Sequence, residues 1–163
     1  NLSAVAFAAR GLVEHLLDAL KLWGVPPRDL VIEVTETAII ADLDKGAHIL
    51  DRLAAEGVRV SIDDFGVGNA SVSYLKQFPA TEMKIDQSFV TGMLGDLRSL
   101  QIVKAMIGFA HQMGMRVVAE GVEDAATLEA LGDLNCNLAQ GWAIGKPKPA
   151  AEFMAELKAP APR

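Results

Sequence analysis

The sequence predicts an α/β fold in which parallel strands are joined by helices. Short apolar, β-branched segments alternate with longer segments of helical periodicity along the whole chain. The connections between these segments are short, which is typical of parallel strands joined by right-handed crossovers. The 163 residues, 51% hydrophobic and 22% charged, are enough for one domain with a sizeable core.

The first elements set the pattern for the rest. Apolar side chains at Leu12, Leu16 and Leu20 recur at helical spacing and predict a helix over 11–23, which Gly24 ends. Residues 30–35 are almost wholly apolar and predict a strand buried on both faces. The same reasoning predicts further strands at 58–63, 82–85, 116–120 and 137–140, and helices at 47–55, 71–78, 99–113, 124–131 and 150–157.

Composition and charge exclude several classes of protein. Fifteen basic and 21 acidic side chains give a net charge of −6, which disfavours binding to a DNA or RNA polymer. The single cysteine, Cys136, excludes an internal disulfide and a cysteine-based zinc site. We find no apolar stretch long enough to span a membrane and no signal-peptide pattern at Asn1. These observations predict a soluble, cytoplasmic, acidic domain.

Polar side chains follow each predicted strand where it ends. In α/β barrels the carboxyl ends of the strands and their loops converge on one face, where catalytic groups lie. A single charged residue in such a place is usually just solvated. Five strands in succession with polar residues at the same end predict a functional site. The residues concerned are Glu33, Glu36, Asp63, Asp64, Lys84, Asp86, Glu120, Glu123 and Gln140.

The residue types at these ends favour a divalent metal. Oxygen ligands without imidazole or thiolate favour Mg²⁺ or Mn²⁺, and the candidate ligands are Asn1, Glu33, Asp63, Asp64 and Glu120. Neighbours in a regular strand point to opposite faces, so Asp63 and Asp64 can share a site only if the strand gives way to a loop between them. Such a pair could serve two metals about 3.5–4 Å apart, as in phosphodiester hydrolysis. Lys84 could then orient the attacking water or offset phosphate charge.

Some of the acidic residues have a simpler interpretation. Glu36, Asp86 and Glu123 each precede a predicted helix, and an acidic side chain at a helix N-terminus is stabilising there. Asp86 and Glu123 are therefore candidates for substrate contact or for helix capping.

Six motifs, taken in chain order, resemble the EAL-domain cyclic-di-GMP phosphodiesterases. They are Asn1-Leu2-Ser3, Glu33-Val34-Thr35-Glu36, Asp63-Asp64-Phe65-Gly66, Lys84-Ile85-Asp86, Ala119-Glu120-Gly121-Val122-Glu123, and Gln140-Gly141-Trp142 followed by Lys146-Pro147. One tetrapeptide would be weak evidence, whereas six in the family's order across nearly the whole chain are specific.

The resemblance implies a modified (β/α)8 barrel of the TIM type that cleaves cyclic di-GMP to pGpG with two Mg²⁺ or Mn²⁺ ions. Carried over by motif, Asn1, Glu33 and Asp63 hold one metal, and Asp63 bridges to a second metal bound also by Asp64 and Glu120. The same resemblance gives three further residues their roles: Lys84 acts on the nucleophilic water, Gln140 orders the site, and Glu36 steadies the loop after Asp64.

Length predicts that this barrel is partial. A complete barrel takes roughly 250 residues, so the chain is short by about 90. We therefore expect residues 1–157 to be an N-terminally truncated barrel domain and 158–163 a frayed tail, with open sheet edges and an uncovered apolar interior. The Glu-Ala-Leu signature would lie upstream, as would any sensory or cyclase domain. The family also implies a homodimer through the loop after Asp64.

Two other functions compete with phosphodiester hydrolysis. The loop carries Val67 and Asn69 where the family usually has threonine or alanine and an aromatic residue, which leaves open a non-catalytic receptor for cyclic di-GMP or a protein-interaction module. An unrelated metal-dependent barrel, such as an aldolase, would explain the acidic strand ends but not the six ordered motifs.

Overall fold

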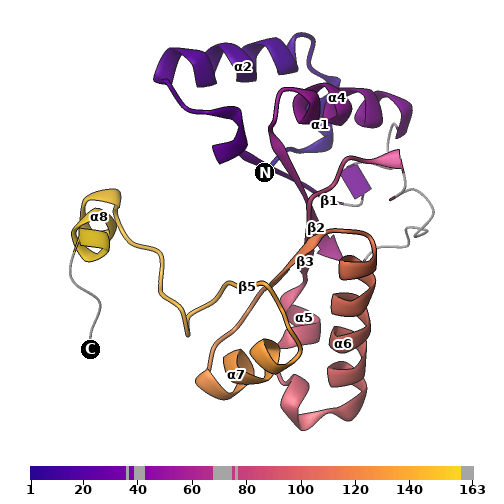
Figure 1. Ribbon diagram of the computed structural model, residues 1–163, viewed down its shortest axis with the longest axis vertical. Helices are drawn as coiled ribbons and strands as arrows, with labels where there is room; N and C mark the ends of the chain where they lie inside the picture. The colour runs from indigo at the N-terminus through magenta and orange to yellow at the C-terminus, as the bar shows by residue number, and fades with distance from the viewer. Residues whose placement is uncertain (36, 39–42, 68–74, 76, 159–163) are drawn as a thin grey trace.

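Five parallel strands form one sheet at the centre of the chain (Figure 1). The computed structural model describes residues 1–35, 37–38, 43–67, 75 and 77–158. The strands are β1 (Val31–Thr35), β2 (Arg59–Phe65), β3 (Glu82–Ile85), β4 (Arg116–Ala119) and β5 (Leu138–Ala139). Their order in the sheet equals their order in the chain, and every neighbouring pair is parallel. The predicted parallel α/β fold is confirmed.

Helices connect and cover these strands. They are α1 (Ala4–Ala8), α2 (Leu12–Trp23), α4 (Leu43–Ala55), α5 (Gln87–Val90), α6 (Leu97–Gln112), α7 (Ala125–Asp133) and α8 (Ala150–Lys158), with 3-10 turns η1 (Pro27–Asp29) and η3 (Met93–Gly95). Helix α4 packs on β2, and α6 packs on β3 and β4. Figure 1 shows α8 at the end of an extended segment, apart from the sheet and the other helices. None of the described helices has the length and apolar character needed to cross a bilayer.

The predicted elements differ from the observed ones mainly where segments are short. Helices α1 and α5 are too short to show helical periodicity in sequence, and the prediction omits both. Most of the helix predicted at 71–78 lies outside the described residues. Helix α8 ends at Lys158, one residue beyond the predicted helix, and residues 159–163 of the predicted tail lie outside the described part of the chain.

Two clusters of buried apolar side chains form the core. The first packs α2 and α4 against β1 and β2, and the second packs α5, α6 and α7 against β3 and β4. Phe65, Ala80 and Phe109 pack against both clusters. The rings of Phe65 and Phe109 are stacked, with centroids 5.9 Å apart and planes 7° from parallel. This pair links the end of β2 to α6.

The other face of the sheet is polar. Strand β1 alternates, with Ile32 and Val34 buried and Glu33 partly exposed, so the prediction that it is buried on both faces is wrong. The expected apolar interior is observed only in part, because Val31, Val118, Leu138 and Ala139 share the lining of an open pocket on this face with polar and charged residues. They include Glu33, Arg59, Glu82, Lys84, Arg116 and Gln140. Alternate residues of β1 to β4 therefore serve the core and this pocket.

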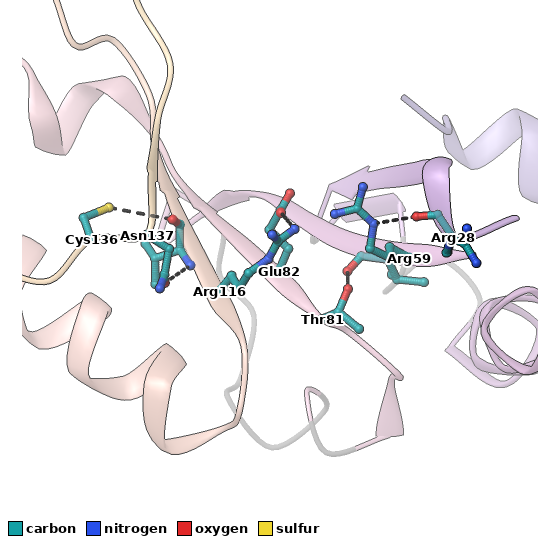
Figure 2. A network of polar contacts seen from close by, with 9 residues as sticks. Arg28, Arg59, Thr81, Glu82, Arg116, Cys136 and Asn137 are labelled. Atoms are coloured by element: carbon teal, nitrogen blue, oxygen red, sulfur yellow. Dashed lines mark hydrogen bonds and ion pairs between the residues drawn. The ribbon is translucent and has the colours of Figure 1, made fainter. Parts of the chain in front are cut away.

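Polar contacts hold the amino ends of the strands (Figure 2). Glu82 accepts a hydrogen bond from the Arg116 guanidinium at 2.9 Å, across the β3–β4 pair. Arg59 Nε donates to the carbonyl oxygen of Arg28 at 3.0 Å. Asn137 Oδ1 accepts from the backbone N–H of Val117 at 2.8 Å, which ties the start of β5 to β4. The starts of neighbouring strands are thus kept in register, and their carboxyl ends carry the predicted site.

Candidate metal centre

Lys84 lies at the centre of the predicted site. Its position on β3 points the side chain toward the polar pocket, and only 6% of that side chain is exposed. The Nζ atom lies 2.7 Å from Glu120 Oε1, 3.0 Å from Asp63 Oδ1 and 3.4 Å from Glu33 Oε2. Glu33 lies in the middle of β1, Asp63 lies near the end of β2, and Glu120 follows β4 directly, so the prediction that acidic side chains from separate strands meet is confirmed.

These contacts keep Lys84 positively charged. Burial alone would lower the pKa of the ammonium, because it disfavours the charged form. The hydrogen bonds to Glu120 and Asp63 and the charges of these two residues outweigh burial, and the pKa is raised well above its ordinary value. At neutral pH Lys84 is therefore a fixed cation and a proton donor in hydrogen bonds. It is not a base.

Asp63 and Asp64 share the site through an irregularity in β2. The strand continues through Phe65, so the predicted loop between the two aspartates is wrong. The pairing with β3 shifts register between Ile62 and Phe65, and Asp64 has a φ of 55°, in the left-handed region. This bulge turns both side chains to one side. The Asp64 N–H donates to Asp63 Oδ1 at 3.1 Å.

The resulting oxygen cluster is compact enough for a cation. One carboxylate oxygen each from Asp63, Asp64 and Glu120 lie within 4.8 Å of one another. Burial raises the pKa of Asp64, and the negative charges of Asp63 and Asp86 raise it further, against the opposing charge of Lys84. A divalent cation would relieve this repulsion, and an all-oxygen donor set fits Mg²⁺ or Mn²⁺.

Asn1 and Gln140 lie at the two flanks of this cluster. The backbone N–H of Leu2 donates to the carbonyl oxygen of Glu33 at 2.7 Å, which places Asn1 beside β1, and Asn1 and Glu33 line one pocket. At the other flank Gln140 follows β5 and lines the polar pocket with Glu33 and Lys84. The Gln140 N–H donates to the carbonyl oxygen of Ala119 at 2.8 Å, and the Gln140 carbonyl oxygen accepts from the Val122 N–H at 3.1 Å.

Three predicted acidic residues lie elsewhere or are not described. Asp86 is the N-cap of α5, where it accepts from the Ser88 N–H at 2.9 Å, in agreement with the capping alternative. Glu123 is exposed, and the cap of the following helix is Asp124, which accepts from the N–H of Thr127 at 2.7 Å. The suggestion that Glu123 caps α7 is therefore wrong. Glu36 lies outside the described residues.

The prediction missed the inner polar layer below the carboxylates. Arg59 and Ser61 precede Asp63 by four and two residues, Glu82 precedes Lys84 by two, and Arg116 precedes Glu120 by four. Since alternate residues of a strand share a face, this spacing could have identified the layer. Ser61 is fully buried, and its hydroxyl has no hydrogen-bond partner among the residues that the structure describes.

Comparison with known proteins identifies the family. The EAL domain family matches residues 1–147, which is most of the chain. The chain belongs to this family. Since the solved relatives are EAL domains with a fold like a TIM barrel, the five-stranded sheet is part of a modified (β/α)8 barrel.

Relatives of this EAL domain include named enzymes. It is 42% identical over 157 residues to the bifunctional diguanylate cyclase/cyclic di-GMP phosphodiesterase MucR of Pseudomonas aeruginosa, covering 96% of this chain and 23% of that protein. It is 36% identical to the cyclic di-GMP phosphodiesterase NbdA of the same species, covering 98% and 20%. The chain therefore spans about a fifth to a quarter of these relatives.

Solved structures agree with the sequence comparison. The PaMucR phosphodiesterase in complex with c-di-GMP superposes with a TM-score of 0.88 at 42% identity, over 94% of this chain and 62% of that one. The EAL domain of Mycobacterium smegmatis DcpA superposes with a TM-score of 0.91 at 36% identity, over 96% and 70%.

Proposed function

We propose that the protein containing this EAL domain is a metal-dependent phosphodiesterase that hydrolyses cyclic di-GMP to pGpG in bacterial signalling. The observation that carries the proposal is the buried Lys84 ammonium among carboxylates from three separate strands. This arrangement coincides with the family's motifs, and the relatives include proteins named as cyclic di-GMP phosphodiesterases.

The chain's residues divide into metal ligands and groups that act on water and substrate. In this proposal Asn1, Glu33 and Asp63 hold one Mg²⁺ or Mn²⁺, and Asp63, Asp64 and Glu120 hold the second. The metals, when bound, supply Lewis acidity toward water and the phosphodiester. Lys84 donates a hydrogen bond that orients the attacking water, and Gln140 keeps the end of β5 in position. Glu36 steadies the loop after Asp64, and Asp86 and Glu123 remain candidates for substrate contact.

Location and assembly also belong to the proposal. The substrate is an intracellular signal in this interpretation, so we place the protein in the cytoplasm. The proposal also includes a homodimer through the loop after Asp64 and an upstream sensory or cyclase domain; the relative MucR is named as a bifunctional diguanylate cyclase/cyclic di-GMP phosphodiesterase.

Turnover by the full-length protein tests the proposal. Incubation with cyclic di-GMP and Mn²⁺ or Mg²⁺, followed by chromatography, should yield pGpG. Glu33→Ala and Lys84→Ala should each reduce turnover at least about 100-fold, because each removes charge from the reacting centre. Glu129→Ala, at an exposed position on α7, is the matched control and should retain full activity.

Two results would contradict the proposal. Tight binding of cyclic di-GMP without product at any metal concentration would favour the non-catalytic receptor. Full activity of Glu33→Ala and Lys84→Ala, with circular dichroism showing an intact fold, would show that the chemistry takes place elsewhere.

A further inference from the structure

Lys84 occupies the place where a metal ion would compete with it. Its ammonium contacts Asp63 Oδ1 at 3.0 Å and Glu120 Oε1 at 2.7 Å. These two residues also supply oxygens to the compact cluster with Asp64. The same carboxylates therefore face two cations, one carried by the protein and one from solution.

Both cations draw on the carboxylates of Asp63 and Glu120. Mg²⁺ binds oxygen ligands at about 2.0–2.1 Å. An ion held by Asp63 and Glu120 would lie close to the atoms that Lys84 Nζ now contacts, and like charges at such separation repel strongly when water is largely excluded. The buried lysine side chain, 6% exposed, is poorly screened by solvent. This repulsion favours the loss of one set of contacts.

The lysine also has a stabilising effect in the absence of metal. Glu33, Asp63, Asp64 and Glu120 place four carboxylates at one edge of the sheet, and Lys84 is the cation that bridges three of them. Without that charge the carboxylates would repel one another, and the strand ends that carry them would lose a common partner.

We propose that Lys84 is an internal substitute for the metal: its ammonium holds Glu33, Asp63 and Glu120 in place before loading, and metal binding displaces it from Asp63 and Glu120. The inference rests on the proposed function, because it takes these residues as the metal site. Metal affinity is then lowered by the contacts that must break, while the site stays assembled without metal. The displaced ammonium becomes available to a water or phosphate oxygen. Metal binding and the catalytic placement of Lys84 are then one event.

Replacing the charge with an apolar side chain of similar length tests the proposal. Mn²⁺ binding to the full-length protein, measured by isothermal titration and by electron paramagnetic resonance of free Mn²⁺, should be at least about tenfold tighter in Lys84→Met than in the wild type. Lys84→Arg, which keeps the positive charge, should stay within about threefold of the wild type. Lys104→Met removes the same charge from an exposed position on α6 and should leave Mn²⁺ affinity unchanged.

Thermal unfolding gives a second readout that activity cannot supply. Without metal, Lys84→Met should unfold at a lower temperature than the wild type, and saturating Mn²⁺ should raise its Tm by more than it raises that of the wild type, because ligand binding to the folded state stabilises it. If Lys84→Met is unfolded without metal, Mn²⁺ should restore its fold.

The outcomes separate this inference from the proposed function. Equal or weaker Mn²⁺ binding by Lys84→Met, or failure of Mn²⁺ to restore its fold, would overturn the proposal that Lys84 substitutes for the metal. The proposed phosphodiesterase activity would still stand if the wild type bound Mn²⁺ and turned over cyclic di-GMP. If neither wild type nor Lys84→Met bound Mn²⁺, the metal site itself would be wrong, and the inference with it.

Discussion

Gly141 lets the chain that leaves β5 pass directly against the backbone of Val122. A Cβ atom at this position would lie 2.2 Å from the Val122 carbonyl oxygen and 2.4 Å from its nitrogen. Two backbone hydrogen bonds hold this close approach. The Val122 N–H donates to the Gln140 carbonyl oxygen at 3.1 Å, and the Ala143 N–H donates to the Val122 carbonyl oxygen at 2.9 Å. Because backbone atoms cannot move aside as a flexible side chain can, this crossing fixes the position of Gln140.

We expect Gly141→Ala to shift this crossing. The added methyl group should reduce the free energy of unfolding by roughly 1–3 kcal/mol and lower turnover of cyclic di-GMP, since Gln140 would move with the backbone. Denaturant unfolding of the full-length protein and the turnover assay measure the two effects. Gly145→Ala is the control, because a methyl group there meets no atom within 4 Å. Wild-type stability of Gly141→Ala would contradict the close approach.

At the scale of single elements, α6 begins with a side-chain cap. Asp96 accepts hydrogen bonds from the backbone N–H groups of Arg98 and Ser99, both at 3.1 Å, and from the Ser99 hydroxyl at 2.7 Å. The hydroxyl contact and the two N–H contacts lower the pKa of the Asp96 carboxyl below its ordinary value of 3.8. The ionised form therefore binds the helix end better than the neutral form does.

This cap makes helix stability depend on pH in acid. Because the pKa is lowered on folding, the contribution of Asp96 is fully present above 3.8 and is lost as pH falls through the lower, folded-state pKa. Asp96→Asn keeps an acceptor but no charge, so its Tm should fall less steeply than that of the wild type in this acidic range. Asp51→Asn, at an exposed position in α4, should follow the wild-type curve. Parallel curves for Asp96→Asn and the wild type would disprove this role.

In the molecule as a whole, two core clusters must stay joined for the site to exist. Asp63 and Asp64 belong to β2, on the side of the first cluster, whereas Lys84 and Glu120 follow from β3 and β4 in the second. The stacked rings of Phe65 and Phe109 pack between the two clusters, directly after the aspartate pair. Packing in the core therefore holds the halves of the candidate metal centre together.

Removing one of these rings should affect both stability and metal binding. We expect Phe109→Ala to lower the free energy of unfolding by about 2–4 kcal/mol and to weaken Mn²⁺ binding, because Phe65 loses its stacking partner. Leu97→Ala, in the same helix but 69% exposed, should change stability by less than about 0.5 kcal/mol. Chemical denaturation and isothermal titration of the full-length protein distinguish the two variants. Unchanged Mn²⁺ affinity in a clearly destabilised Phe109→Ala would show that this core packing does not hold the metal centre together.

Periodicity and motif order were enough to predict the parallel fold, the strands, and the meeting of Glu33, Asp63 and Glu120 near Lys84. Local signals suffice here because a buried strand or a long amphipathic helix imposes its spacing on neighbouring residues. They failed at β1, whose exposed Glu33 face belongs to the pocket, and at α7, whose cap is Asp124 and not Glu123. The failure at β1 depends on partners distant in sequence, whereas the failure at α7 depends on which of two adjacent residues reaches the Thr127 N–H.

Residue identity alone therefore accounts for the presence of an acidic, oxygen-rich set at the carboxyl ends of parallel strands. How that set is arranged depends on packing between distant segments: the bulge that turns Asp63 and Asp64 to one side, the polar layer of Arg59, Glu82 and Arg116, and the three contacts of Lys84. The reason is that a side chain's charge and donor atoms are local properties, whereas the distance between two charges is set by the register of strands that lie far apart in the chain.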